Sequence, residues 1–179
     1  MMIVDGVKIF AFSDTHGLHR KMLVPCDADV VICAGDAVED NLSPEDYRDF
    51  LDWFEAVPAG LRIFVPGNHE LIFMIAPKYG ELLFKDRDIF LGLNAVVYHR
   101  ALSFYCFAFP EMLPRVIRDA GMADVLVSHY PPDMIPGSVA LEPRFHVFGH
   151  DHSLKDFPDS PSGTKYFNVS VYNELNEKF

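Results

Sequence analysis

The chain has 179 residues, half of them hydrophobic, and its 26 acidic against 15 basic residues give a formal net charge of −11. This length suits one compact domain and no composition shift marks a boundary, so residues 1–179 are expected to form a single domain. The net negative charge argues against an extended nucleic acid as a partner, because tight binding to that polyanion depends on clustered Lys and Arg. No feature of the sequence predicts a protein partner.

The N-terminal segment and the cysteines bear on cellular location. Asp5 and Lys8 interrupt the first apolar run, which lacks the basic lead and the small-residue cleavage pattern of a signal peptide. No later stretch reaches the roughly 18 unbroken apolar residues that a membrane span requires. The three cysteines are widely spaced and form no CxxC pair, which argues against a disulfide framework and a cysteine zinc site. We expect a soluble cytoplasmic protein that binds no membrane.

Short runs rich in Val, Ile and Phe predict β-strands along the whole chain. Most of these runs are nearly continuous in apolar character, which is typical of strands buried on both faces of a sheet that helices cover. In chain order, the predicted strands span residues 7–13, 30–34, 61–65, 125–128, 144–148 and 166–171.

Helical patterns fall between these strands. In SPEDYRDFLDWFEAV, residues 43–57, Ser43 and Pro44 provide a helix start, and apolar residues recur at helical spacing behind them. LPRVIRDAG, residues 113–121, predicts a second helix that Gly121 ends. Residues 89–109 contain no clear helix and are compatible with a β-hairpin. The predicted fold class is therefore α/β.

Polar residues follow five of the apolar runs at the same relative place. In an open α/β sheet the carboxyl ends of the strands form the crevice where ligands bind, so side chains distant in sequence converge there. Each of the five residues has a side chain that can bind a metal ion, and they are Asp14, Asp36, Asn68, His129 and His150.

Two of these positions carry a second ligand-type residue two places further on. The pairs are Asp14 with His16 and His150 with His152. In an extended segment, a spacing of two points both side chains to the same side. Donors of the Asp, Asn and His type suit Mn, Fe or Zn, whereas Ca and Mg prefer oxygen ligands throughout.

The ordered series D-x-H, G-D, G-N-H-E, S-H and G-H-x-H resembles the calcineurin-like metallophosphoesterases. The matching blocks reach from Ser13 to His152 in the family's order, as SDTH (13–16), GD (35–36), GNHE (67–70), SH (128–129) and GHDH (149–152). The resemblance implies a layered αββα sandwich and one calcineurin-like metallophosphoesterase domain over residues 1–179. It also implies a centre with two divalent ions, for which Mn2+ is favoured and Fe, Zn, Ni and Co are alternatives.

The family pattern also implies a role for each matching residue. Asp36 would bridge the two ions, and a hydroxide held between them would attack phosphorus. His69 would be catalytic and not a ligand, protonating the leaving oxygen or stabilising the transition state, work that suits an imidazole at neutral pH. One ion would be bound by Asp14, His16 and His152, and the other by Asn68, His129 and His150.

The substrate class is less fully determined. Protein phosphatases of this superfamily carry G-D-x-x-D-R-G, whereas this chain has GDAVEDN, with Glu39 at the acidic position and no following Arg. By analogy with small members of the superfamily, we favour a phosphodiesterase acting on a small phosphodiester or nucleotide. The alternatives are a phosphomonoesterase, a protein phosphatase and a catalytically silent metal-binding scaffold.

Four further residues are interpreted from the sequence. Either Glu39 or Asp40 could orient His69, and the sequence leaves that choice open. Glu70 is interpreted only as the start of a helix through LIFMIA, where a carboxylate favours the backbone dipole. His146 is interpreted as a core histidine whose ring nitrogens are satisfied.

Overall fold

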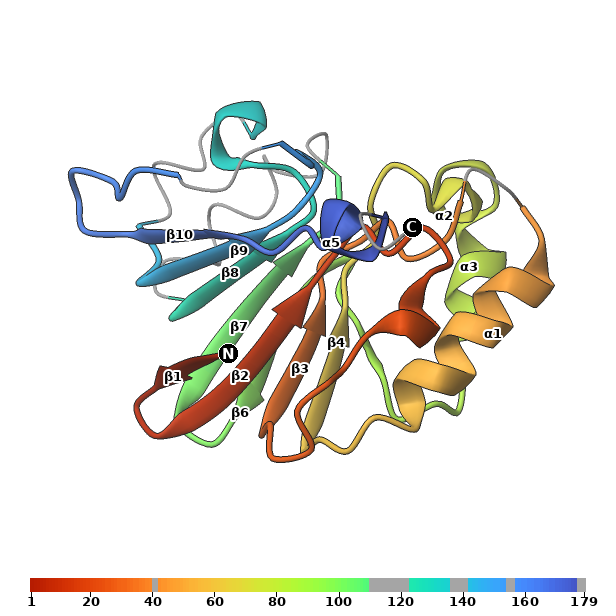
Figure 1. The fold of residues 1–179 in the computed structure, drawn as a ribbon, viewed down its shortest axis with the longest axis horizontal. Helices are drawn as coiled ribbons and strands as arrows, with labels where there is room; N and C mark the ends of the chain where they lie inside the picture. Colours follow the sequence, from red (N-terminus) through yellow and green to blue (C-terminus); the bar gives the residue numbers. More distant parts are fainter. Residues whose placement is uncertain (40–41, 110–122, 136–141, 154–156, 177–179) are drawn as a thin grey trace.

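The fold was obtained as a computed structural model, which describes residues 1–39, 42–109, 123–135, 142–153 and 157–176. Two five-stranded mixed sheets form its centre and face one another, as Figure 1 shows. Side chains from both sheets belong to one continuous apolar core, which includes Phe12, Ile63, Phe104 and Val127. This arrangement confirms the α/β class and the paired sheets of the predicted sandwich.

The first sheet has the order β1-β2-β3-β4-β5. β1 pairs antiparallel with β2, and the remaining neighbours are parallel. All four residues of β3 are buried, as expected for a strand covered on both faces. Its strands are β1 (Met2–Val4), β2 (Val7–Phe12), β3 (Val30–Cys33), β4 (Leu61–Phe64) and β5 (Phe90–Leu91).

The second sheet has the order β10-β9-β8-β7-β6. β6 and β7 form the antiparallel hairpin predicted within residues 89–109, and the other neighbours are parallel. Its strands are β6 (Asn94–His99), β7 (Leu102–Phe107), β8 (Val125–Ser128), β9 (Phe145–Phe148) and β10 (Lys165–Asn168).

Helices α1 (Pro44–Glu55), α2 (Leu71–Ile75) and α3 (Pro77–Leu83) lie beside the first sheet, on the side away from the second (Figure 1). The predicted apolar stripe of α1 is buried, and Phe54 meets Phe12 edge to face at 5.9 Å. The short helices η1 (His19–Lys21), η3 (Pro132–Met134) and α5 (Tyr172–Asn176) follow strand ends. The helix predicted over 113–121 lies outside the described residues.

Two features of the described chain bear on the sequence predictions. The three cysteines are unpaired, with Cys33 and Cys106 buried and Cys26 exposed. Among the helices of the described ranges, none combines the length and apolar character that crossing a membrane requires.

Candidate metal centre

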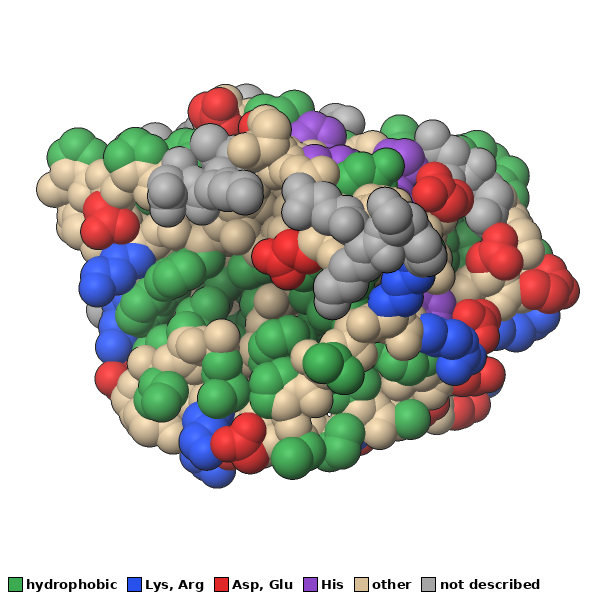
Figure 2. Space-filling model, viewed as in Figure 1, with side chains coloured by type: hydrophobic (Ala, Val, Ile, Leu, Met, Phe, Trp, Pro, Cys, Tyr) green, Lys and Arg blue, Asp and Glu red, His purple; other side chains and the backbone are tan. Residues whose placement is uncertain are grey.

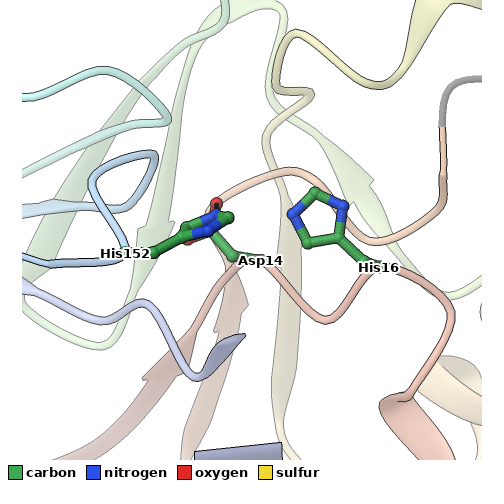
Figure 3. A group of neighbouring side chains, drawn as sticks. All are labelled: Asp14, His16 and His152. Atoms are coloured by element: carbon green, nitrogen blue, oxygen red, sulfur yellow. Dashed lines mark ion pairs between the residues drawn. The ribbon is translucent and has the colours of Figure 1, made fainter. Parts of the chain in front are cut away.

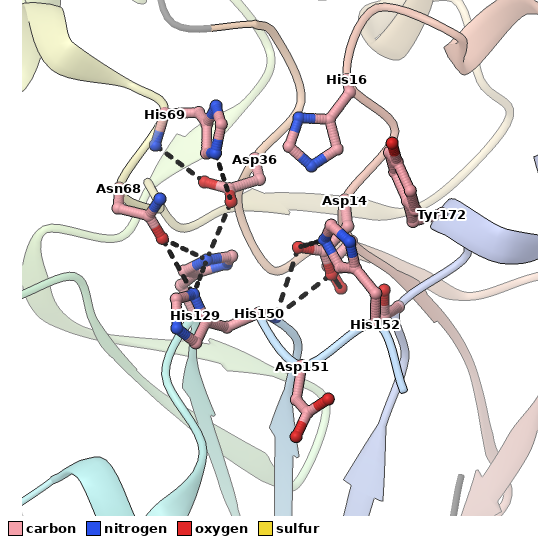
Figure 4. A network of polar contacts seen from close by, with 12 residues as sticks. Asp14, His16, Asp36, Asn68, His69, His129, His150, Asp151, His152 and Tyr172 are labelled. Carbon is pink, nitrogen blue, oxygen red and sulfur yellow. Dashed lines mark hydrogen bonds and ion pairs between the residues drawn. The ribbon is translucent and has the colours of Figure 1, made fainter. Parts of the chain in front are cut away.

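The loops after five strands meet at one edge of the two sheets. β2 leads to Asp14, β3 to Asp36 and β4 to Asn68, while the second sheet delivers His129 after β8 and His150 after β9. Figure 4 shows these side chains pointing toward one another, together with those of His16 and His152. The structure therefore brings together all seven residues that the sequence singled out as candidate ligands.

Four donor atoms form the tightest part of the cluster. His129 Nε2 lies 3.1 Å from Asn68 Oδ1 and 3.1 Å from Asp36 Oδ2. His150 Nδ1 lies 2.9 Å from the same Asn68 oxygen and 3.3 Å from His129 Nε2. Ligands that surround a tetrahedral ion at about 2.1 Å lie about 3.4 Å from each other. The spacing of these four atoms is therefore close to that of a metal coordination shell.

The second nitrogen of the His129 ring fixes which atom faces the cluster. His129 is fully buried, and its Nδ1 donates a hydrogen bond to the Ala34 carbonyl at 2.8 Å. Burial lowers the pKa of His129, but the hydrogen bond and charge of Asp36 outweigh it and raise that pKa to about 9. A positive charge is thus favoured beside Asp36, whether a proton or a metal ion supplies it.

A second group consists of Asp14, His16 and His152 (Figure 3). Each contributes one ligand atom, and these atoms lie within 4.8 Å of one another, with His152 Nε2 3.3 Å from Asp14 Oδ1. Asp14 is fully buried, and the backbone N–H of His150 donates to both of its carboxylate oxygens. His16 Nε2 is buried without a hydrogen-bond partner among the described residues, which is costly unless a bound group such as a metal ion satisfies this nitrogen.

Asp36 lies between the two groups in Figure 4. Its Oδ2 contacts His129, and its Oδ1 accepts a hydrogen bond from the backbone N–H of His69 at 2.9 Å. Burial raises the pKa of Asp36, but contacts with His129 and His69 outweigh burial and lower it overall. The carboxylate is therefore ionised and has its two oxygens directed to different neighbours.

The backbone at this edge of the sheets is strained. Asp14, His16, Asp36 and His150 adopt positive φ angles of 58°, 43°, 52° and 70°. Non-glycine residues rarely occupy this left-handed region, and such strain persists where the surrounding structure imposes it, often at functional sites. Four of the seven candidate ligands thus depend on backbone conformations that the loops alone would not favour. The interpretation of the Asp14–His16 and His150–His152 pairs as parts of extended segments is corrected, because Asp14, His16 and His150 are left-handed.

Glycines allow these loops to approach closely. A Cβ built on Gly67 would collide with the Asp36 carboxylate and with His129 Cγ, the latter at 2.7 Å. A Cβ on Gly149 would collide with Ser13 and would lie 2.7 Å from Asp14 Oδ2. These two glycines are therefore required by close packing next to the ligands, and neither is among the positive-φ glycines.

Glu70 has a larger role than the sequence indicated. It precedes α2, as predicted, but its side chain makes no capping bond to that helix. Its fully buried carboxylate instead accepts backbone N–H bonds from Asp36 at 2.9 Å, Ala37 at 2.8 Å, Val38 at 3.4 Å and Gly67 at 2.6 Å. The interpretation of Glu70 as only a helix start is corrected: it joins the loop of Asp36 to the loop of Asn68.

His69 lies at the rim of the cluster, with 24% of its side chain exposed. Its ring meets the His16 ring edge to face at 4.5 Å. Glu39 is close to both rings and forms a third potential ligand group with them, its Oε2 lying 3.8 Å from His16 Nδ1. Of the two acidic residues left open by the sequence, Glu39 is therefore near His69, and Asp40 lies outside the described residues.

His146 is a core histidine, as interpreted from the sequence. It is 1% exposed, and its Nε2 lies 2.7 Å from Ser128 Oγ. Because that hydroxyl donates to the Tyr130 carbonyl, Nε2 of the neutral ring is the donor to Ser128. Burial lowers the pKa of His146 to about 3.

This pKa predicts a loss of stability in acid. Below about pH 6.5 the unfolded chain binds a proton at His146 that the folded chain excludes, so stability falls by about 1.4 kcal/mol per pH unit until the folded pKa is reached. His146→Gln retains a hydrogen-bond donor but cannot be protonated in this pH range. The slope of stability against pH is therefore expected to decrease by the contribution of about one proton. Urea unfolding of the chelator-treated protein between pH 6.5 and 4 measures it, and parallel curves for both proteins would contradict the prediction.

Fold and site together define an α/β protein with clustered Asp, Asn and His side chains suited to binding metal. Residues 7–154 match the family model described as calcineurin-like phosphoesterase, and the chain belongs to this family. Its membership confirms the resemblance seen in the motifs.

Known relatives agree with this assignment. Metallophosphoesterase domain-containing protein 1 of Homo sapiens is 27% identical over an alignment covering 89% of this chain and 64% of the relative, as is the Mus musculus protein. The chain thus spans less than two thirds of these relatives. The crystal structure of phosphopantetheinyl hydrolase from Mycobacterium tuberculosis shares the fold, with a TM-score of 0.70 and 16% identity over 96% of this chain and 92% of that one.

Proposed function

We propose that this protein is a dimetal phosphoesterase that acts on small phosphodiesters. The observation that carries the proposal is the convergence of Asn68 Oδ1 and Asp36 Oδ2 on His129 Nε2, each at 3.1 Å from that nitrogen. An amide oxygen, a carboxylate oxygen and an imidazole nitrogen held by its other nitrogen are all suited to face a cation. Asp36 and His129 are buried, and polar groups of this kind are costly to assemble away from water without such a cation.

The two groups divide naturally into two sites that share Asp36. The first would be formed by Asp14, His16 and His152, and the second by Asn68, His129 and His150. Imidazole in both sites favours a transition metal, of which Mn2+ is our first choice. When bound, the ions would lower the pKa of a water molecule and neutralise charge on the phosphoryl oxygens.

His69 would act on the leaving group. Its partly exposed ring stands beside Asp36 and His16 at the rim, where a substrate oxygen can reach it. Its backbone N–H is held by Asp36, which fixes the residue in relation to the candidate ligands. Donation of a proton by His69 to the departing oxygen is typical general-acid work for an imidazole.

The surroundings of the centre support a diester over a monoester. A cavity of about 440 Å³ adjoins His150 and His152 and is also lined by Asp133 and Asp151. A smaller one of about 220 Å³ is lined by Glu39, Asp46 and Asp49. Among the described residues that line them, no Lys or Arg is available for the second negative charge of a phosphomonoester. A diester, with a single negative charge, suits these acidic walls better.

The proposal predicts about two metal ions per chain and faster turnover of diesters than of monoesters. If the second negative charge of a monoester lacks a partner and this costs about 1.4 kcal/mol in the transition state, kcat/KM should favour the diester by about tenfold. Elemental analysis of the purified protein, followed by assays on matched aryl and nucleotide phosphomonoesters, phosphodiesters and cyclic nucleotides, measures both quantities.

The outcomes separate the competing functions. A metal-loaded protein that hydrolyses none of these compounds would refute the enzyme and favour the metal-binding scaffold. Preferential hydrolysis of monoesters would retain the phosphoesterase and overturn the diester preference. A phosphopeptide substrate in the same panel addresses the protein phosphatase alternative.

A further inference from the structure

The segment that follows β10 returns to the candidate metal centre from the far end of the chain. After Asn168, the backbone runs beside Ser13, whose N–H donates to the Val169 carbonyl at 3.0 Å and whose carbonyl accepts from Val171 N–H at 3.1 Å. Ser13 directly precedes Asp14, the first candidate ligand. Residues 168–173, named here the C-terminal brace, are thus fixed to the start of the loop that carries Asp14 and His16.

Tyr172 in this brace covers two candidate ligands. Its ring stacks on the His152 ring, with centroids 4.1 Å apart and an interplanar angle of 20°. It also meets the His16 ring edge to face at 5.2 Å and 82°. Figure 4 shows the Tyr172 ring alongside both imidazoles. One aromatic ring therefore contacts both imidazoles of the Asp14, His16 and His152 group.

Two asparagines of the brace hold the backbone of the loop that carries His152. Asn173 Nδ2 donates to the His152 carbonyl at 2.6 Å, and Asn168 Nδ2 donates to the Asp151 carbonyl at 2.7 Å. Lys21 Nζ contacts the Leu175 carbonyl at 3.4 Å and so links α5 to η1. The loop of His152 is therefore held by polar contacts to its backbone as well as by the ring stack.

We propose that the C-terminal brace positions His152 and His16 for metal binding, with Tyr172 as the positioning residue. This role rests on the dimetal centre proposed above. The two sites differ in their need for such support. His129 is fully buried and held by Ala34, whereas 32% of the His152 side chain is exposed. The His152 ring contacts Asp14, the His16 ring edge to face at 5.3 Å, and the Tyr172 ring, which stacks on it.

Stacking of Tyr172 on His152 is expected to favour metal binding by His152. An imidazole that donates electron density to a cation becomes electron-poor, and its attraction to the electron-rich face of a phenol ring increases. The ring also restricts the rotation of His152, which lowers the entropy lost when a metal binds. Loss of residues that orient a ligand commonly weakens metal affinity by about 10-fold to 100-fold.

The test is a titration with Mn2+ alone, by calorimetry, on chelator-treated wild type, Tyr172→Ala, Tyr172→Phe and Asn173→Ala. Tyr98→Ala is the matched control, because Tyr98 is 72% exposed and lies on β6, away from the centre. Tyr172→Ala is expected to weaken one of two binding steps by about 10-fold to 100-fold and to leave the other unchanged. Tyr172→Phe, which keeps the stack, is expected to restore wild-type binding, and Asn173→Ala to weaken the same step less.

Visible spectra of the Co2+-loaded proteins and urea unfolding of the metal-free proteins complete the test. Tyr172→Ala should alter the Co2+ bands of one site and leave the unfolding of the metal-free fold near that of Tyr98→Ala. Unchanged Mn2+ binding in Tyr172→Ala, or equal loss in Tyr172→Phe, would overturn the role of the stack. A wild-type chain that binds no metal would instead refute the dimetal centre itself and this role with it.

Discussion

Asp36→Asn is expected to remove metal binding and activity together. Asp36 is the carboxylate between the two ligand groups, with Oδ2 3.1 Å from His129 Nε2 and Oδ1 directed to the loop of His69. A carboxylate can join two cations that lie about 3.5 to 4 Å apart, whereas the amide offers one neutral oxygen. Loss of several kcal/mol of charge stabilisation corresponds to a fall in kcat/KM on the order of 10³-fold or more.

His69→Ala provides the comparison that separates the roles of the two residues. Because His69 is proposed to donate a proton and not to bind a metal, this variant should retain about two ions. Its kcat should fall by about 10²-fold to 10⁴-fold, the usual contribution of a general acid. Elemental analysis and steady-state kinetics of both variants are the measurements. Equal metal loss in the two would overturn the assignment of His69 and would favour the third ligand group, formed by His16, Glu39 and His69.

Glu70→Gln should destabilise the fold by about 3 kcal/mol or more. The carboxylate is fully buried among four backbone N–H donors and needs to be ionised to accept from all of them. The amide of Gln can accept hydrogen bonds through its oxygen only, and its NH2 group would face backbone N–H donors. Each buried N–H group left without an acceptor destabilises the fold by about 1–3 kcal/mol. The expected effect is large because the same contacts join the loops of Asp36 and Asn68.

The measurement is urea unfolding at pH 8 in the presence of chelator. Burial and the charge of Asp36 raise the pKa of Glu70 to about 7, against the backbone N–H bonds that lower it, so the carboxylate is ionised at pH 8. Glu81→Gln is the matched control, because Glu81 is exposed on α3. Equal stability of Glu70→Gln and Glu81→Gln would show that the four contacts contribute little.

The sequence alone determined the class of fold and the candidate ligands. Its buried strands appear as nearly continuous apolar runs, and a parallel strand ends by necessity at the edge where its neighbours end. A metal-capable residue placed just after such a run is therefore located in space by its position in the chain. For this reason Asp14, Asp36, Asn68, His129 and His150 could be identified together before their distances were known.

Only the tertiary structure decided what supports these ligands. Glu70 is an ordinary first-turn acid in sequence, and its four N–H partners come from two loops that meet only in the folded chain. Tyr172 follows the last strand without a motif, yet its ring lies 4.1 Å from that of His152. Strand ends follow from local apolar patterns, whereas such contacts depend on how distant segments pack, and residue type and spacing do not encode that packing locally.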